Sequence, residues 1–450
     1  MGMRCSKVQK YLTFLLFVGW VFLAAGCGRQ EQVTLPTGTM LPESTSTVAS
    51  EVESAPALKQ PEAGAASIQA APEPTEEGQG QVSPCAEGTC GSLMITQAGQ
   101  PQQINVNEAG LMPRAQPSPL PDDLSENGRW VIDTGQPSPD GSLVAYTSVG
   151  YETGAPVFVQ NLESGEWQNL IAAVNQRLGG ASALPLDYWW DVIGWFPDSR
   201  RLMIGPSDLS FVAVVELTSS TAQIISFPGG GRGGRMFVNL APDGESFLFT
   251  GDNGSEQTFN IYDLSTGQVT TLYTQPYEQG FVANPRFSPD GETIAYVNQS
   301  GAAEASAVST GPQDTLNLLS IDGGAPKTLA EGSLWMAVPA WSPDGERLAF
   351  AMADADLPTA AASAIEAGDT DPAPVRGNVW TVTTGGAQEQ ITFVDGLARS
   401  PTWSMDGQTL AFVTHDGQVG LVNADEPGLI WQAAGPSEQA PELISAFFLP

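Results

Sequence analysis

The chain has 450 residues, of which 41% are hydrophobic and 15% are charged, so it can form a packed core and wholesale disorder is excluded. Its 50 acidic and 17 basic residues give a net charge of −33, and a surface of this sign repels nucleic acids and anionic lipid headgroups. With a single histidine, His415, a histidine-rich metal site is nearly excluded, and a mechanism with a histidine base would depend on that one residue.

Residues 1–26 have the pattern of a secretory signal. Basic residues come first, an uncharged apolar stretch follows, and small residues precede Cys27. The segment resembles a bacterial lipoprotein signal, in which the cysteine after the small residues is lipidated and becomes the new N-terminus. The resemblance implies that Cys27 carries a lipid anchor. An uncleaved transmembrane anchor is the alternative, and both interpretations place the rest of the chain outside the cytoplasm, at a membrane.

Residues 27–84 are dominated by Pro, Thr, Ser, Ala, Gln and Glu and show no hydrophobic periodicity. This composition predicts a disordered tether behind the lipidated residue. Cys85 and Cys90 follow, and in an exported protein such a pair is typical of a disulfide. A redox or metal pair is the alternative, but the spacing is four residues rather than two and no further soft ligand is present.

From about residue 92 the chain consists of short β-rich runs, and a Pro-Asp-Gly signal followed by a hydrophobic run recurs. Proline fixes φ, aspartate bonds nearby backbone N–H groups and glycine accepts positive φ, so each copy predicts a tight hairpin turn. The aspartates of the six copies are Asp140, Asp198, Asp243, Asp290, Asp344 and Asp406. A large apolar residue usually stands two positions before the proline, namely Trp195, Leu240, Phe287, Trp341 and Trp403.

A second hairpin with its own Gly-rich turn follows the first in each unit, for example around Gly267 and around Gly385 and Gly386. Four short strands per unit of about 45–60 residues are typical of a propeller blade. We therefore expect an all-β fold, a β-propeller of four-stranded blades over residues 85–450, with six repeats within residues 128–433.

These six repeats resemble those of the TolB-like β-propeller family, which is related to the W-D repeat propellers. The resemblance implies a role in docking proteins of the cell envelope. The same repeat also builds the propellers of prolyl-oligopeptidase-type enzymes, but this sequence has no Gly-x-Ser-x-Gly nucleophile motif. The enzymatic part of the resemblance is therefore not expected to apply.

The two ends of the repeat region predict how the ring closes. Residues 93–107 resemble the second hairpin of a blade, and residues 443–450 resemble a first strand that stops where Asp-Gly would follow. Together they would form a composite seventh blade, which removes exposed sheet edges. A six-bladed ring with the N-terminal hairpin as an addition is the alternative.

The predicted insertions lie on one face of the ring, at residues 172–190, 228–235, 298–313 and 353–376. Variable loops on a rigid scaffold are where binding usually occurs, although loops also accumulate insertions wherever these are tolerated.

The candidate binding residues on this face are Tyr188, Trp189, Trp190, Arg232 and Arg235. Aromatic clusters anchor partners. Trp190, and also Trp189, could instead begin an inner strand and belong to the core. The arginines lie in a Gly-rich run that could meet an acidic group or be a mobile linker. Acidic residues in the 353–376 insertion lack the spacing of a calcium loop, so we expect no metal and no cofactor.

Three functions remain open. The first is a non-catalytic, monomeric lipoprotein that binds envelope proteins through its loop-rich face and is held at the membrane by Cys27. The second is a propeller that binds a small ligand or solute. The third is a hydrolase or lyase with carboxylates in the channel, which two close carboxylates of perturbed pKa would favour.

Overall fold

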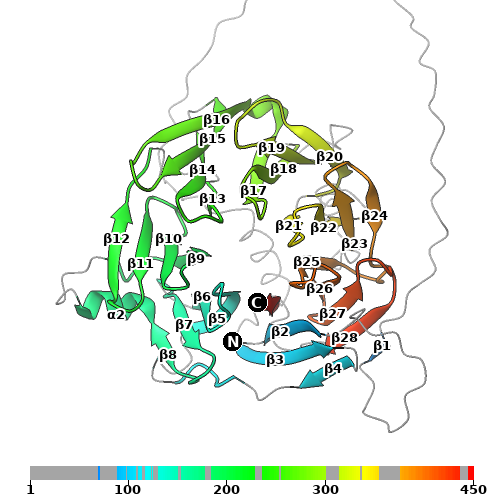
Figure 1. Cartoon of the computed structure of the whole chain (residues 1–450), viewed down its shortest axis with the longest axis horizontal. Helices are drawn as coiled ribbons and strands as arrows, with labels where there is room; N and C mark the ends of the chain where they lie inside the picture. Colours follow the sequence, from blue (N-terminus) through cyan, green and yellow to red (C-terminus); the bar gives the residue numbers. More distant parts are fainter. Residues whose placement is uncertain are drawn as a thin grey trace, which may run out of the picture.

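The computed structural model is a ring of seven antiparallel four-stranded sheets, a seven-bladed β-propeller (Figure 1). The predicted all-β fold is confirmed. The helices in the described residues are α2 (Leu170–Arg177) and the 3-10 turn η1 (Tyr277–Gln279). The structure describes residues 69–70 and 89–450, apart from 98, 108–109, 114–116, 123, 125–129, 151–153, 178–183, 229–235, 253–254, 301–313, 335–336, 354–375 and 436–443.

The blades are numbered in chain order, and the strands of each blade are given from the innermost to the outermost. Blade 1 holds β5 (Trp130–Pro137), β6 (Leu143–Gly150), β7 (Phe158–Asn161) and β8 (Trp167–Asn169). Blade 2 holds β9 (Trp190–Trp195), β10 (Arg201–Pro206), β11 (Val212–Glu216) and β12 (Thr221–Ile225). Blade 3 holds β13 (Val238–Leu240), β14 (Ser246–Asp252), β15 (Glu256–Asp263) and β16 (Val269–Pro276).

The remaining blades follow the same order. Blade 4 holds β17 (Phe281–Phe287), β18 (Thr293–Gln299), β19 (Asp314–Ser320) and β20 (Lys327–Gly332). Blade 5 holds β21 (Ala340–Trp341), β22 (Arg347–Ala353), β23 (Gly377–Thr383) and β24 (Gln388–Gln390). Blade 6 holds β25 (Ala398–Trp403), β26 (Thr409–Thr414), β27 (Val419–Asn423) and β28 (Ile430–Ala434).

The six predicted Pro-Asp-Gly turns each join the first and second strand of a blade. In blade 5 the Ser342 hydroxyl donates to the Asp344 carboxylate and accepts the Arg347 N–H at 2.9 Å. The same carboxylate accepts the Glu346 N–H at 3.0 Å. The arrangement recurs at Ser138, Ser288 and Ser404. The repeat therefore encodes a closed hydrogen-bond ring at the turn, which fixes the register of the inner hairpin.

The large residue two positions before the turn proline joins neighbouring blades. Trp341 donates its indole N–H to the Arg286 carbonyl at 3.2 Å, and Trp403 donates to the Ala340 carbonyl at 3.0 Å. Trp195 donates in the same way to the Gln136 carbonyl at 2.9 Å. Each acceptor lies on the inner strand of the preceding blade, so these tryptophans hold adjacent inner strands in a fixed relation.

Buried side chains fill the spaces between the blades. The seven hydrophobic clusters combine residues of neighbouring sheets, as where Val297 and Leu316 of blade 4 meet Phe350 and Val382 of blade 5. Such packing around the whole ring makes the inner wall a rigid support for the side chains that face the channel.

Blade 7 is built from both ends of the repeat region, as predicted, and the ring has seven blades rather than six. Its strands are β29 (Ile444–Leu449), β2 (Thr89–Gln97), β3 (Gln100–Asn107) and β4 (Gly110–Pro113), in that order from the channel outward. One detail of the prediction was wrong: β2 and β3 are the second and third strands of the blade, not its second hairpin. The β4 strand supplies the outer edge.

The joint between blades 7 and 1 is closely packed. A Cβ atom at Gly135 of β5 would lie 2.6 Å from Cε1 of Phe447 and 2.9 Å from Cε1 of Tyr146. The Ser445 hydroxyl also donates to the Asp133 carbonyl at 3.0 Å. The absence of a side chain at position 135 therefore lets the C-terminal strand approach blade 1.

A short strand, β1 (Gln69–Ala70), pairs in parallel with β28 as a fifth strand of blade 6. It belongs to the segment predicted as a tether, whose other residues lie outside the described part of the chain. Within the described residues, the helices are too short and too polar to traverse a lipid bilayer.

Candidate functional site

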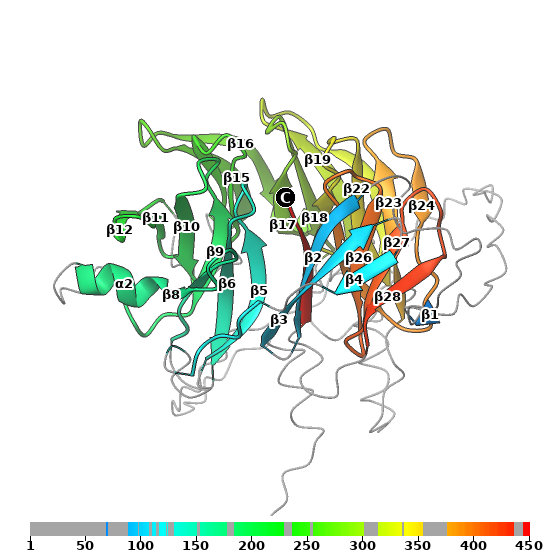
Figure 2. The ribbon, with the colours of Figure 1, turned by 60° about the horizontal axis from the view of Figure 1, so that its bottom comes forward.

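The ring has two different faces. The Pro-Asp-Gly turns and the turns between third and fourth strands form one, which we call the turn face. The opposite one, the loop face, carries the connections between second and third strands and between blades. Figure 2 shows the ring obliquely, with the strands extending between these faces. The four predicted insertions fall in the connections from β8 to β9, β12 to β13, β18 to β19 and β22 to β23, which begin and end at the loop face. Residues 178–183, 229–235, 301–313 and 354–375 of these connections lie outside the described part of the chain.

The predicted aromatic cluster divides between core and surface. Trp190 begins β9 and is 1% exposed, so its interpretation as a core residue is the right one and its place among the binding residues was wrong. Tyr188 is half-buried and packs edge-on against Trp190 and Phe211, with ring centroids 6.4 and 6.2 Å away. Trp189 is also half-buried, and Leu186 beside it is 68% exposed. The accessible part of this cluster is therefore Leu186, Tyr188 and Trp189.

The other predicted site residues fall largely outside the described part of the chain. Cys27, Cys85, Arg232, Arg235 and the acidic residues of the 354–375 segment are among them, and Cys90 is described only by its backbone in β2. His415 is exposed in the turn between β26 and β27. Within the described residues, His, Cys, Asp and Glu nowhere gather in a group of three that could hold a metal ion.

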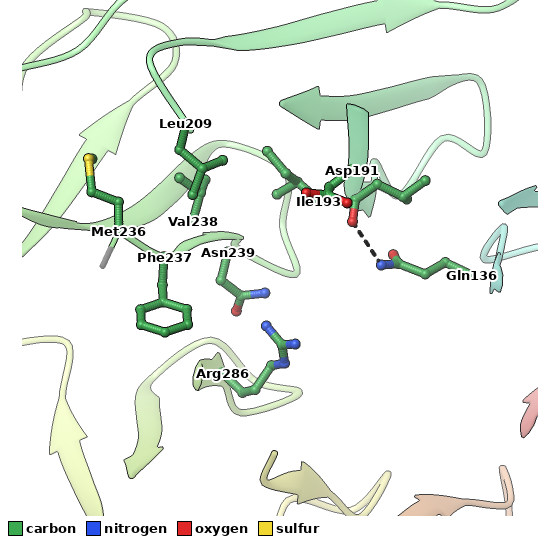
Figure 3. A pocket seen from close by; sticks show the side chains of 10 residues that line it. Gln136, Asp191, Ile193, Leu209, Met236, Phe237, Val238, Asn239 and Arg286 are labelled. Carbon is green, nitrogen blue, oxygen red and sulfur yellow. Dashed lines mark hydrogen bonds between the residues drawn. The ribbon is translucent and has the colours of Figure 1, made fainter. Parts of the chain in front are cut away.

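A cavity of about 460 Å³ lies in the channel wall and opens among the inner strands of blades 1 to 4 (Figure 3). This is a volume typical of small-ligand sites, roughly 300–1,000 Å³. Its polar lining residues are Gln136, Asp191, Asn239 and Arg286, and its apolar ones are Val192, Ile193, Leu209, Met236, Phe237 and Val238. Sequence reasoning did not single out any of these residues as a site.

The register of the repeat explains why these polar residues meet. Asp133, Asp191 and Arg399 each stand seven residues before the turn aspartate of their blade (140 − 133, 198 − 191 and 406 − 399). Their strands β5, β9 and β25 also share a one-residue bulge nearby. The three side chains therefore belong to one layer of the channel.

A second layer lies closer to the turn face. Gln136, Asn239 and Arg286 each stand four residues before their turn aspartate (140 − 136, 243 − 239 and 290 − 286). The Gln136 side-chain amide donates to the Val192 carbonyl at 3.1 Å, which ties blade 1 to the strand that carries Asp191. The Asn239 side-chain oxygen accepts the Phe287 N–H at 3.0 Å, so its NH₂ group is directed toward Arg286 (Figure 3).

The two carboxylates influence each other. Burial within the ring raises the pKa of Asp133 to about 6, although Arg399 opposes the rise. Burial, and then the neighbouring Asp133 carboxylate, raise the pKa of Asp191 to about 6. The Asp191 side chain is nevertheless exposed to the channel, so solvent works against this rise. Neither carboxylate accepts a hydrogen bond from the described residues.

Arg286 provides a positive charge at the same cavity. Its side chain is half-buried, and its one hydrogen bond within the described residues is a long 3.4 Å contact from Nη1 to the Pro285 carbonyl. Burial lowers the pKa of Arg286, but a guanidinium stays charged at neutral pH. No acidic side chain of the described residues lies within 4.0 Å of it, so most of its donors face the cavity without a partner.

The sequence contains a signal that could have led to this site. Aligning the six repeats on their turn aspartates shows aspartate at the seventh preceding position in two copies and arginine in a third. The other copies have Met236, Ala283 and Ala337 there. Charged residues at one equivalent position of an inner strand indicate a side chain that faces solvent rather than the core.

Comparison with curated proteins finds one partial relative. No family model matches the sequence. An uncharacterized protein of Agrobacterium fabrum, Atu1656, is 30% identical over 182 residues, which are 39% of this chain and 53% of the relative. The chain therefore spans about half the length of the curated relative that it matches.

Several solved structures share the architecture. TolB from Acinetobacter baumannii has 18% identity and a TM-score of 0.42, over 66% of this chain and 62% of TolB. A putative TolB from Agrobacterium tumefaciens has 15% identity and a TM-score of 0.39, over 71% and 96%. An oligogalacturonate lyase in complex with manganese has 11% identity and a TM-score of 0.48, over 79% and 87%. The seven-bladed ring itself agrees with the propeller that the repeats predict, and no property of these distantly similar proteins is transferred to this chain.

Proposed function

We propose that this protein is a non-catalytic lipoprotein of the cell envelope that binds protein partners through its loop face. The observation that carries the proposal is the one-sided elaboration of the ring: all four insertions belong to connections that begin and end at the face where Leu186, Tyr188 and Trp189 present apolar surface. A rigid scaffold with loops on one face is suited to docking. The signal-like segment and Cys27 support location in the envelope, as does the TolB-like repeat.

The test is a cross-linking capture from native envelope extract with the full chain as bait. A variant with Trp189→Ala, Arg232→Ala and Arg235→Ala changes the loop face. Met405→Ala is the matched control, because Met405 is 54% exposed in the Pro-Asp-Gly-type turn of blade 6, on the turn face. We expect one partner, identified by mass spectrometry, to be captured by the wild type and the control and lost with the loop-face variant. Equal capture by all three baits would refute the assignment of the face.

A second candidate function is binding of a small ligand in the channel. The cavity favours it, because polar side chains from four successive blades converge there beside an apolar wall. This function is compatible with protein docking, since the cavity and the exposed aromatic residues occupy different parts of the molecule.

The Asp133 and Asp191 pair is the one feature that favours a hydrolase or lyase. An acid and a base need environments that drive their pKa values apart, so that one carboxyl is protonated and the other ionised. Here both pKa values are raised to about 6, so neither group is distinguished as the acid or as the base. We therefore propose that the pair binds rather than catalyses, and an Asp133→Asn variant that keeps its ligand affinity but loses a hydrolytic activity would contradict this.

A further inference from the structure

We propose that the channel cavity binds a small zwitterion, either an amino acid or a short peptide. Its ammonium group would lie against the carboxylate of Asp191, and its carboxylate against the guanidinium of Arg286. The inference rests on the second candidate function above and is independent of protein docking at the loop face.

The first argument is the distribution of charge around the channel. The aspartates come from blades 1 and 2, which are adjacent, whereas Arg286 comes from blade 4 and is separated from them by blade 3. No ion pair within 4.0 Å joins Asp191 and Arg286 in the described residues. In the part of the chain that the structure describes, the acidic residue and the basic residue of the cavity lining are therefore not paired with each other.

The second argument is the cost of such an arrangement. A charge removed from water is normally paired or hydrogen-bonded, because its desolvation is costly. This cost applies to the half-buried Arg286, whereas Asp191 is exposed to the channel and keeps its solvent. Asp191 accepts no hydrogen bond from the described residues, and Arg286 has only its long contact to the Pro285 carbonyl. A ligand that carries both charges would compensate both residues at once, whereas a simple cation or anion would leave one residue uncompensated.

The third argument is the match of donors and acceptors. An ammonium group has three donors, which the Asp191 carboxylate and the Gln136 side-chain oxygen can accept. A guanidinium presents paired donors that fit a carboxylate, and the NH₂ group of Asn239 lies beside Arg286 as a further donor (Figure 3). The polar residues thus provide acceptors at one end of the cavity and donors at the other.

The apolar lining adds a place for a side chain of the ligand. Leu209, Met236 and Phe237 line the cavity toward the loop face. Leu209 adopts a φ of 46°, an uncommon conformation for a branched residue, and such strain is concentrated at functional sites. A zwitterion with a hydrophobic side chain would fit this combination of walls.

The experiment is calorimetric titration of the full chain in detergent with leucine, Leu-Gly and Leu-Gly-Gly. These probes share an apolar side chain and increase the separation of ammonium and carboxylate stepwise. We expect at least one to bind with a dissociation constant below about 1 mM. N-acetylation or C-amidation of that probe is expected to weaken binding roughly tenfold each, because each removes a charge-assisted contact.

Protein variants test which residue contacts each end of the ligand. In Arg286→Gln, amidation of the ligand should cause no additional loss, and in Asp191→Asn, acetylation should cause none. Asp187→Asn and Arg200→Gln are matched controls, because both residues are exposed and lie outside the cavity lining. Arg286→Lys, which keeps the positive charge, is the substitute if Arg286→Gln does not fold.

The outcomes are decisive in each direction. Failure of all three probes to bind at about 10 mM would overturn the proposal, as would binding that neither end modification weakens. The two ligand modifications need no protein variant, so misfolding cannot mask the result. The capture experiment tests protein docking at the loop face, and the titration tests zwitterion binding in the cavity. Failure of one proposal can therefore be distinguished from failure of the other.

Discussion

Asp133 and Asp191 connect the charge state of the channel to the stability of the ring. The folded-state pKa of each is raised from 3.8 to about 6, so the folded state binds protons more readily than the unfolded chain between these values. By linkage, the free energy of unfolding falls as the pH rises through this window, and the loss is complete above about pH 6. The carboxylates therefore reduce stability at neutral pH, which is consistent with groups retained for binding.

Asp191→Asn should remove part of this penalty. We expect the variant to be more stable than the wild type by about 1 kcal/mol near pH 8 and equal to it near pH 4, a modest gain because channel solvent screens the exposed side chain. Urea denaturation at the two pH values measures the difference, with Asp187→Asn as control. A variant that is less stable than the wild type near pH 8 would contradict the raised pKa.

The turn aspartates have lowered rather than raised pKa values, so their effect on stability has the opposite sign. Hydrogen bonds from Ser342 and from the Glu346 N–H hold the pKa of Asp344 below its ordinary value, and the same applies to Asp140 and Asp290. These groups contribute stability above their unfolded pKa, and that contribution is lost as the pH falls through the lowered folded value.

Two substitutions test the hydrogen-bond ring of the turn. Ser342→Ala should lower the free energy of unfolding by about 1–2 kcal/mol, because both contacts of the hydroxyl are lost. Blade 3 has Ala241 at the equivalent position, where the backbone N–H bonds the Ser246 carbonyl at 3.0 Å as in the other turns. Ala241→Ser should therefore raise stability by up to about 1 kcal/mol. Chemical denaturation measures both, and an unchanged free energy of unfolding in Ser342→Ala would rule out the proposed role of the hydroxyl.

At the scale of elements, the inner strands act as one unit because each is tied to its neighbour. Trp341 bonds the carbonyl of Arg286, the residue whose guanidinium lines the cavity. The position of that charge therefore depends on the adjoining blade. The β-bulges of β5, β9, β17 and β25 similarly turn selected side chains toward the channel.

Trp341→Phe keeps an aromatic side chain but removes the indole N–H donor. We expect the free energy of unfolding to fall by about 1–2 kcal/mol, since the Arg286 carbonyl loses its partner. Trp403→Phe, which affects the Ala340 carbonyl away from the cavity lining, is the matched variant. Both should lose similar stability, whereas only Trp341→Phe should weaken binding of the zwitterion by titration. Equal affinities of the two variants for the zwitterion would show that the Trp341 hydrogen bond does not position Arg286 for binding.

At the scale of the whole molecule, closure of the ring determines stability. Blade 7 takes its inner strand β29 from the C-terminal end and its other strands from residues 89–113. Its β29–β2 pairing extends from Ser92 opposite Leu449 to Gln97 opposite Ile444. Without β29, the inner edge of β2 would be exposed, and blade 1 would lose its packing against Phe447 and Leu449.

Removal of residues 444–450 should therefore destabilise the entire ring rather than one blade. We expect the thermal midpoint to fall by roughly 10 °C or more and the transition to broaden. Circular dichroism and calorimetry measure both effects, with Ser445→Ala as a milder change that removes only the contact to Asp133. An unchanged midpoint after the truncation would show that the blades fold independently.

The sequence alone determined the architecture of this protein, because the repeat is local. Ser, Pro, Asp and Gly act within a single turn, and the strand pattern on each side has a period of two, so both are visible without knowledge of distant contacts. The composite blade was also predictable, since each terminal segment resembled part of a repeat. The role of Trp190 was not predictable in this way: its residue type allowed either a binding or a core position, and the structure places its side chain in the core.

Only the tertiary structure showed which charged residues lie around the same part of the channel. Asp133, Asp191 and Arg286 lie on three different inner strands, and each is an ordinary surface-type residue in its own segment. Closure into a ring of seven blades brings these strands around one axis, and the distance of each residue from its turn aspartate, seven residues for the aspartates and four for Arg286, sets its depth in the channel. A cavity of this kind depends on contacts between blades that are far apart in sequence, which no local pattern contains.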